Sequence, residues 1–231
     1  RRLEPDGLVY RGAFRLPGPS GGSNWGWCGD GKAYRPDGDS DGPDDGYPGS
    51  LFGFGHDHQH FVSEIGIPAP VVSKGKSAAE LPTARTLQPF ADIRAGHFTD
   101  YEIPRADLAY LPTQGEQTRP KLYFCFGQHM HETFKGPTHG WCEVDLSDPK
   151  TAGPWSVGGL TEYVTSDYLF AIPKAWADAH VGGMRFSVKG KQDLGKVMAC
   201  AADHERGRLY VFERNADEDD RALVHVWEVK K

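Results

Sequence analysis

The sequence predicts an all-β fold and, within that class, a β-propeller of about five blades. Three observations predict it: glycine and proline are frequent, a strand-rich motif occurs three times, and both ends of the chain read as strands. The 231 residues are expected to form one domain, residues 1–231. The alternatives are a ring of about six shorter blades and a β-sandwich.

Chain-breaking residues favour short elements. Glycine contributes 29 residues and proline 17, about one residue in five, which argues against long helices. Hydrophobic residues make up 38% of the chain and aromatic residues 12%, which is enough apolar surface for a core. One short helix is expected at residues 173–180, where Pro173 suits a first turn.

The repeated motif occupies residues 33–68, 109–146 and 201–229. In each copy a polar turn leads to a strand of the type Leu-aromatic-x-aromatic, at residues 51–54, 122–126 and 209–212. A later strand ends in Glu-Ile or Glu-Val, at residues 64–65, 143–144 and 228–229. Alternating apolar residues with aromatic enrichment are typical of strands, so each copy is expected to be a meander of about three antiparallel strands.

The spacing of the copies predicts further blades. The copies begin at residues 33, 109 and 201, farther apart than the ~40–50 residues of one blade. We therefore expect a degenerate blade around residues 87–104 and another around residues 160–173. Residues 8–17 read as a strand that lacks nearby partners. Pairing with the C-terminal strand would close the ring and remove two free edges.

Five segments carry a resemblance: SLFGFGHD, FVSEIGIP, HGWCEVDL, RLYVFER and VHVWEV. They resemble segments of exported bacterial β-propeller-like proteins of unassigned function. The resemblance implies a propeller fold and a secreted or periplasmic location, and it implies no reaction. The wider class of small propellers includes sugar-active hydrolases, polysaccharide lyases and lectins, which is an analogy at the level of the fold.

Charge and cysteine usage exclude several classes. The formal net charge is −6 without a run of Lys and Arg, so no nucleic-acid partner is expected. The chain has no apolar stretch of the ~18 residues that a membrane span requires. The four cysteines, Cys28, Cys125, Cys142 and Cys200, form no CxxC pair, so a zinc ribbon is excluded. They form either two disulfides in an exported protein or buried thiols. A monomer is expected.

Histidines gather at two equivalent turns. His56, His58 and His60 share one face if the strand at residues 51–54 continues through them, and such a set can hold a divalent metal. His129 and His131 lie at the same turn of the second copy. Because equivalent turns lie at one end of a propeller, we expect the two groups to converge, with His131 among the metal ligands. The alternative is a set of solvated turn histidines.

An acidic segment suggests a second metal site. Asp37, Asp39 and Asp41 follow the pattern D-x-D-x-D-G, which matches the first half of a calcium loop. The twelfth position is Pro48 rather than Glu, which excludes an EF-hand. The alternative is an acidic surface turn.

Catalytic roles follow from the chemistry of polysaccharide lyases. The pattern GxxxxGK[ST] is not present, so a P-loop is unsupported, and no organic cofactor is expected. A lyase needs a base to abstract a proton and a cation to neutralise a uronate carboxylate. The candidates of these types are His129, His139, Tyr168 and Arg214. The alternative for each is packing or ordinary surface charge.

The sequence thus predicts an exported, glycan-active propeller, a polysaccharide lyase or a hydrolase, with a histidine-rich site assisted by zinc or calcium. Its expected partner is a polysaccharide or another carbohydrate. The alternatives are a non-catalytic, lectin-like propeller that binds a sugar or another ligand, and a scaffold that binds another protein.

Overall fold

The computed structural model describes residues 5–28, 30–40, 42–98, 104–114, 117–128, 137–155, 169–171, 186–188, 200–203, 206–212 and 223–230. Within these residues the regular structure is β-strand, apart from three single-turn 3₁₀ segments: η1 (Pro5–Gly7), η2 (Pro43–Asp45) and η3 (Ala78–Glu80). The all-β prediction is confirmed. The helix predicted at residues 173–180 lies outside the described residues.

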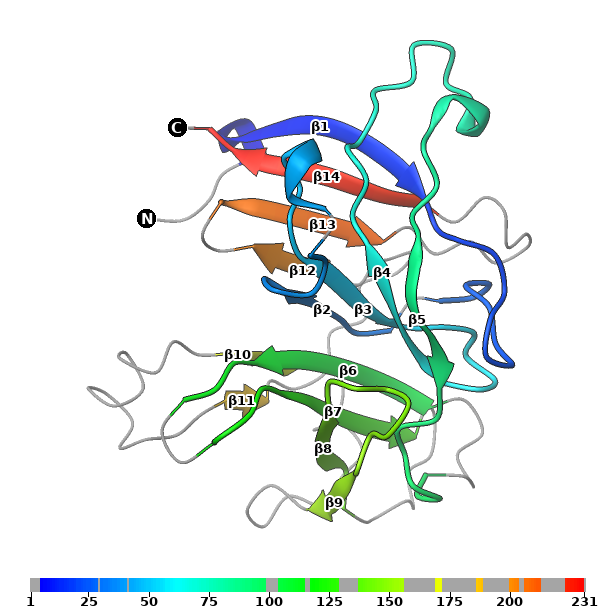
Figure 1. Cartoon of the computed structure of the whole chain (residues 1–231), viewed down its shortest axis with the longest axis vertical. Coiled ribbons are helices and arrows are strands. Elements are labelled where there is room, and N and C mark those ends of the chain that lie inside the picture. The colour runs from blue at the N-terminus through cyan, green and yellow to red at the C-terminus, as the bar shows by residue number, and fades with distance from the viewer. Residues whose placement is uncertain are drawn as a thin grey trace. The chain divides into compact units, whose positions relative to one another are not determined.

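The chain forms two compact units, one of Arg1–Phe90 with Leu194–Lys231 and one of Ala91–Asp193. The first sheet of unit 1 follows the order of the chain (Figure 1). Its strands are β2 (Lys32–Arg35), β3 (Ser50–Phe54), β4 (Val62–Gly66) and β5 (Thr86–Ala91).

The second sheet of unit 1 joins the two ends of the chain. Its order is β1 (Leu8–Arg15), β14 (Leu223–Val229), β13 (Arg208–Phe212) and β12 (Cys200–Asp203). Figure 1 shows β1 lying beside β14, and their register runs antiparallel with a bulge between Tyr10 and Gly12. The predicted pairing of the N-terminal strand with the last strand is therefore present.

Unit 2 contains one four-stranded sheet and one two-stranded sheet. The larger sheet consists of β6 (Pro104–Leu111), β7 (Lys121–Gln128), β8 (His139–Glu143) and β9 (Ala152–Trp155). The smaller one pairs β10 (Leu169–Ala171) with β11 (Phe186–Val188) in antiparallel register.

Each repeated motif supplies three adjacent strands of one sheet, and a fourth strand completes each sheet: β5, β9 and β1. The prediction of a separate blade around residues 87–104 is wrong, because β5 pairs with β4. Strand β10 falls within the blade predicted around residues 160–173, most of which lies outside the described residues. The described strands form separate sheets, and no closed barrel or ring of blades is found among them.

The core of unit 1 lies between its two sheets. Tyr34 and Leu51 of the first sheet belong to one buried cluster with Tyr210 and Val226 of the second sheet. The rings of Tyr34 and Tyr210 are stacked with centroids 5.8 Å apart. Burial of aromatic and aliphatic side chains at this interface stabilises the unit by about 1.5–3 kcal/mol per fully buried side chain.

Phenylalanine packing holds unit 2 together. The rings of Phe98 and Phe126 are stacked with centroids 4.9 Å apart, and Phe124 meets Phe126 edge to face at 5.7 Å.

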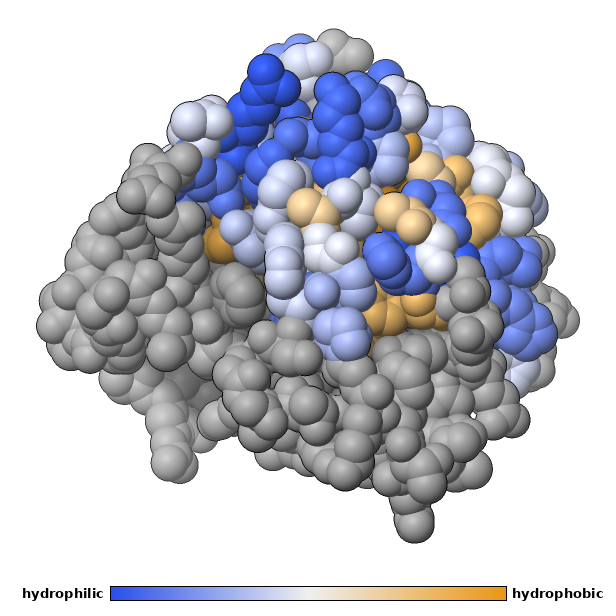
Figure 2. Space-filling model, turned by 90° about the horizontal axis from the view of Figure 1, so that it is seen from below, coloured by the Kyte–Doolittle hydropathy of each residue, from blue (hydrophilic) through white to orange (hydrophobic). Residues whose placement is uncertain are grey.

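On the face seen in Figure 2, most described side chains are hydrophilic and the apolar ones form small patches among them. In the part of the chain that the structure describes, no helix has the length and hydropathy of a membrane-spanning segment.

Candidate metal centre

The loop between β3 and β4 folds as a tight turn. Strand β3 ends at Phe54, and the backbone N–H of His60 donates to the carbonyl of His56 at 2.9 Å. His60 has a φ of 50°, in the left-handed region that an extended strand does not contain. The expected continuation of the strand through His58 and His60 is therefore wrong, because the turn ends the alternation that would place the histidines on one face.

Glycine permits the chain to enter this turn. The N–H of Gly55 donates to the carbonyl of Phe61 at 2.8 Å, and the N–H of His56 donates to the carbonyl of Asn24 at 2.7 Å. A Cβ atom at Gly55 would lie 2.5 Å from the ring of Phe90 and 2.6 Å from the Asn24 carbonyl oxygen. Any side chain here would push the turn away from the segment that anchors it.

The turn brings the side chains of His56, Asp57 and His58 together. One ligand atom from each lies within 4.8 Å of the other two. The Nδ1 atom of His56 is 3.2 Å from Oδ1 of Asp57, and the rings of His56 and His58 have centroids 4.7 Å apart. The side chains of His56 and Asp57 are 19% and 16% exposed and His58 is exposed, so the group is open to solvent on one side.

The separations between these three ligand atoms, within 4.8 Å, are close to those that a bound metal ion requires. Two ligands of a tetrahedral zinc ion lie about 3.4 Å apart, given bonds of about 2.1 Å. Nδ1 of His56 now accepts a hydrogen bond from the backbone N–H of His58 at 3.1 Å, and an ion bound at Nδ1 would replace it. The lost bond costs about 1 kcal/mol. That is small beside zinc-binding free energies on the order of 10 kcal/mol.

The ligand chemistry selects among ions. Imidazole nitrogens suit zinc, copper and nickel, whereas calcium prefers six to eight oxygen ligands. Two imidazoles and one carboxylate form the type of three-ligand set that leaves a coordination position of zinc open to water or substrate. The group formed by His56, Asp57 and His58 therefore fits zinc better than calcium.

His60 lies apart from this group. Its ring is fully buried, and Nε2 is 2.7 Å from Oδ2 of Asp30. The ammonium group of the buried Lys32 donates to the carbonyls of Asp30 and Phe54, at 2.7 and 3.1 Å. His60 thus anchors the base of the turn instead of extending the set of ligands.

The acidic segment meets arginines. Oδ1 of Asp37 is 3.2 Å from Nε of Arg35, and Oδ1 of Asp39 is 3.0 Å from a guanidinium nitrogen of Arg85. Asp41 lies outside the described residues. Among the residues that the structure describes, the one group of three or more side chains that could hold a metal ion is that of His56, Asp57 and His58, and the site predicted at Asp37, Asp39 and Asp41 stays a prediction.

His139 is buried in β8 and 4% exposed. Burial lowers its pKa to about 4, so the ring is neutral near pH 7. Its Nδ1 lies 2.8 Å from the hydroxyl of Thr138. Its role as a catalytic base stays a prediction. His129, His131, Tyr168 and Arg214 lie outside the described residues, and the convergence of the two histidine turns stays a prediction.

Three of the cysteines are present as thiols in the described structure. Cys28, Cys125 and Cys142 are buried and free of disulfides, which favours the buried-thiol interpretation for these three. Burial raises the pKa of Cys142 to about 12, so this thiol stays protonated and unreactive.

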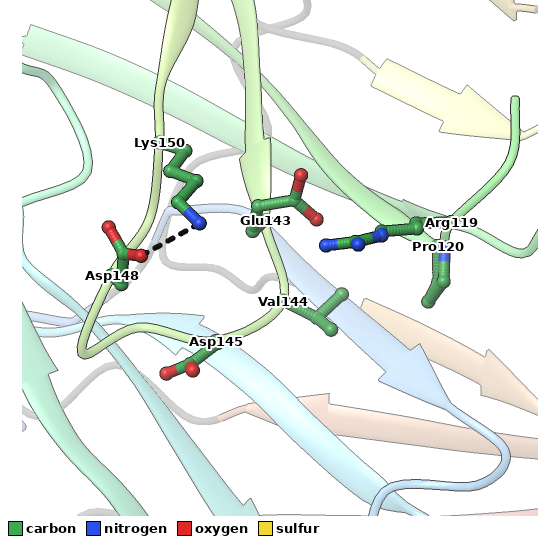
Figure 3. A pocket seen from close by; sticks show the side chains of 7 residues that line it. All are labelled: Arg119, Pro120, Glu143, Val144, Asp145, Asp148 and Lys150. Carbon is green, nitrogen blue, oxygen red and sulfur yellow. Dashed lines mark ion pairs between the residues drawn. The ribbon is translucent and has the colours of Figure 1, made fainter.

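Sequence reasoning missed a pocket in unit 2 with a volume of about 260 Å³. Figure 3 shows the side chains of Arg119 and Glu143 directed toward one another at its wall. Glu143 pairs with Lys121, and Lys150 pairs with Asp148 at 3.0 Å, so the lining charges largely neutralise one another. These residues follow no recognisable spacing, and no sequence signal pointed to them.

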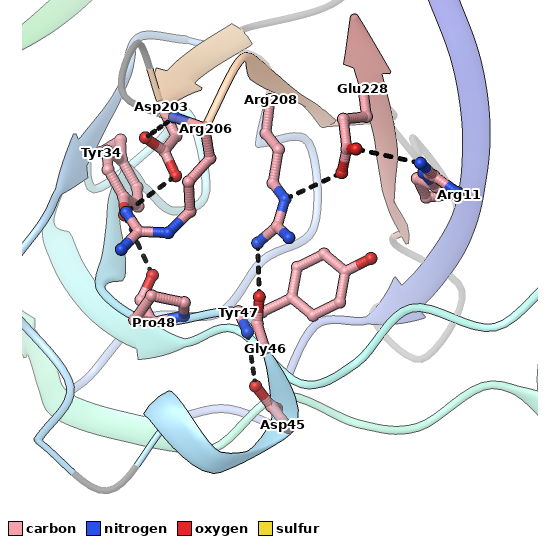
Figure 4. Close-up of polar contacts among 10 residues, drawn as sticks. All are labelled: Arg11, Tyr34, Asp45, Gly46, Tyr47, Pro48, Asp203, Arg206, Arg208 and Glu228. Carbon is pink, nitrogen blue, oxygen red and sulfur yellow. Dashed lines mark hydrogen bonds and ion pairs between the residues drawn. The ribbon is translucent and has the colours of Figure 1, made fainter. Parts of the chain in front are cut away.

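A polar network ties the two sheets of unit 1 together (Figure 4). Arg208 of β13 places its guanidinium 4.0 Å from the ring centroid of Tyr47, donates to the carbonyl of Gly46 at 2.6 Å and pairs with Glu228 at 3.3 Å. All of these partners of Arg208 belong to unit 1, which identifies the network as part of the scaffold.

The fold and the group of His56, Asp57 and His58 together define an all-β protein with a candidate metal-binding turn between two strands. Comparison with known proteins adds no relative, since no family model, no curated protein and no solved structure matches the chain.

Proposed function

We propose that this protein binds a divalent metal ion, with zinc preferred, through His56, Asp57 and His58. The observation that carries the proposal is the approach of one ligand atom from each side chain to within 4.8 Å of the others. Three protein ligands leave a coordination position for water or for an oxygen atom of a ligand. The site would then polarise that ligand as a Lewis acid.

A propeller arrangement of the sheets remains part of the proposal. Two features support it: two of the larger sheets have four strands in meander order, and in the third β1 completes the meander of β12, β13 and β14 beside β14. The edge strands β12 and β2 of the two sheets in unit 1 also contact one another. An N-terminal strand that completes the last blade is how a propeller avoids an open edge.

The ligand class that we propose is an anionic carbohydrate such as a uronate. A carboxylate oxygen would occupy the open position of the metal, as a hard donor that zinc accepts. This step rests on the predicted glycan activity. Absorbance of unsaturated products across a panel of polysaccharides tests it. Metal binding without such products would leave a metal-dependent binding protein.

Equilibrium dialysis of the full chain against zinc, followed by elemental analysis, tests the metal proposal. We expect about one equivalent per chain. His58→Ala removes one ligand and should weaken binding at least 10-fold, whereas His97→Gln, at an exposed histidine of unit 2, should leave it unchanged. Equal binding by both variants would refute the site.

A further inference from the structure

His60 holds an uncommon backbone conformation at the end of the candidate metal-binding turn. Its φ is 50°, in the left-handed region that few residues other than glycine adopt, and its side chain is fully buried. Such conformations persist only where the surroundings enforce them, and they cluster at sites that bind ligands.

The side chain of Asp30 holds His60 in place. Oδ2 of Asp30 lies 2.7 Å from Nε2 of His60, and the side chain of Asp30 is only 11% exposed. The backbone carbonyl of Asp30 also accepts a hydrogen bond from Lys32 Nζ, which donates in addition to the carbonyl at the end of β3. The contact thus joins the segment before β2 to the far end of the turn.

The backbone of His60 also helps to fix the distance between the candidate metal ligands His56 and His58. The backbone N–H groups of Gln59 and His60 both donate to the carbonyl of His56, at 3.0 and 2.9 Å. His58 lies inside the loop that these bonds close. A shift of His60 that broke its bond to the His56 carbonyl would let His58 move relative to His56.

We propose that Asp30 and His60 form a positioning pair that preorganises His56, Asp57 and His58 for the metal ion. This inference rests on the proposed metal-binding function. Side chains that orient metal ligands without touching the ion typically contribute 10–100-fold to metal affinity. We therefore expect loss of the pair to weaken zinc binding by about 10–100-fold while all three ligands remain.

Variants separate the backbone from the side chain. His60→Gly accepts a positive φ but removes the contact with Asp30. Asp30→Ala removes the carboxylate and leaves the residues of the turn itself unchanged. Asp30→Asn keeps an oxygen that can accept a hydrogen bond from His60. Zinc affinity, measured by competition with a chelator on protein that circular dichroism shows to be folded, should fall strongly in the first two variants and be partly restored in the third.

Cobalt(II) provides a readout that a purely structural role would not move. We expect the intense visible absorption of tetrahedral cobalt in the unaltered chain and in Asp30→Asn, and a weaker band in His60→Gly and Asp30→Ala. Folded Asp30→Ala and His60→Gly proteins that bind zinc as tightly as the unaltered chain would overturn the positioning role. If the unaltered chain and His58→Ala bind zinc equally, or not at all, the metal proposal itself fails.

Discussion

The hydroxyl of Ser50 on β3 donates a hydrogen bond to Oε1 of Glu64 on β4 at 2.5 Å, inside the first sheet of unit 1. Gln88 donates to the other carboxylate oxygen at 2.5 Å, and a guanidinium nitrogen of Arg35 lies 3.4 Å away. Glu64 is 2% exposed. Burial raises the pKa of this carboxyl above its usual 4.5, against the lowering effects of Ser50, Gln88 and Arg35.

The first prediction concerns this carboxyl and pH. A raised pKa in the folded state means that Glu64 favours folding below its unfolded pKa, and that this contribution is lost as pH rises through the folded pKa. Glu64→Gln is neutral at every pH. The difference in urea midpoint, variant minus unaltered chain, should therefore increase as pH rises from about 4 to 7. A constant difference across that range would contradict the account of Glu64.

The second prediction concerns His139, whose effect on the pH dependence of stability is opposite in sign to that of Glu64. Burial holds the pKa of His139 at about 4 in the folded state, while the unfolded state takes up a proton below about pH 6.5. Stability is therefore present above pH 6.5 and lost as pH falls toward 4, by up to about 3 kcal/mol. His139→Gln should lose less stability in acid, as measured by urea unfolding at a series of pH values. A parallel pH dependence in the two proteins would show that His139 is solvated.

The third prediction tests the scaffold network. Arg208→Ala removes the stacking on Tyr47 and the hydrogen bond to Gly46, and it should lower the free energy of unfolding by about 2 kcal/mol. Arg11, which is 44% exposed at its side chain, pairs with the same Glu228. Arg11→Ala should cost less than about 1 kcal/mol, because exposed ion pairs contribute little. If the two variants lost the same free energy of unfolding in chemical denaturation, the result would argue against a larger contribution from the contacts of Arg208.

The fourth prediction concerns the entry to the candidate metal-binding turn. Gly55→Ala places a Cβ atom 2.5 Å from the ring of Phe90, so the turn must shift. We expect a loss of about 1–3 kcal/mol in stability and weaker zinc binding. Gly18→Ala is the matched control, because nothing lies within 4 Å of a Cβ atom there. Zinc titration and thermal unfolding of both variants measure the effect.

The strands could be predicted from the sequence because their alternation is local. The patterns at residues 51–54, 122–126 and 209–212 lie within β3, β7 and β13. Of the fourth strands, β1 was predicted to pair with the C-terminal strand, as it does, whereas β5 was assigned to a separate blade because it follows a long excursion after β4. Strand pairing over such distances depends on the whole core rather than on a local pattern.

Two of the three residues of the candidate site were predicted from the sequence, and its shape was not. His56 and His58 were named as ligands, whereas Asp57 was not, because an alternating strand would have pointed it to the opposite face. The departure comes from the left-handed conformation of His60 and its contact with Asp30. A contact between residues this far apart in the chain leaves no trace in the spacing of the histidines.

The fifth prediction tests whether His56, Asp57 and His58 hold the ion, by zinc X-ray absorption spectroscopy on the metal-loaded chain. We expect a first shell of nitrogen and oxygen at about 2.0–2.1 Å, with the outer-shell scattering of two imidazole rings. In His58→Ala, the scattering of one ring should disappear. A sulfur shell at about 2.3 Å, or a spectrum that His58→Ala leaves unchanged, would place the ion elsewhere and contradict the claim.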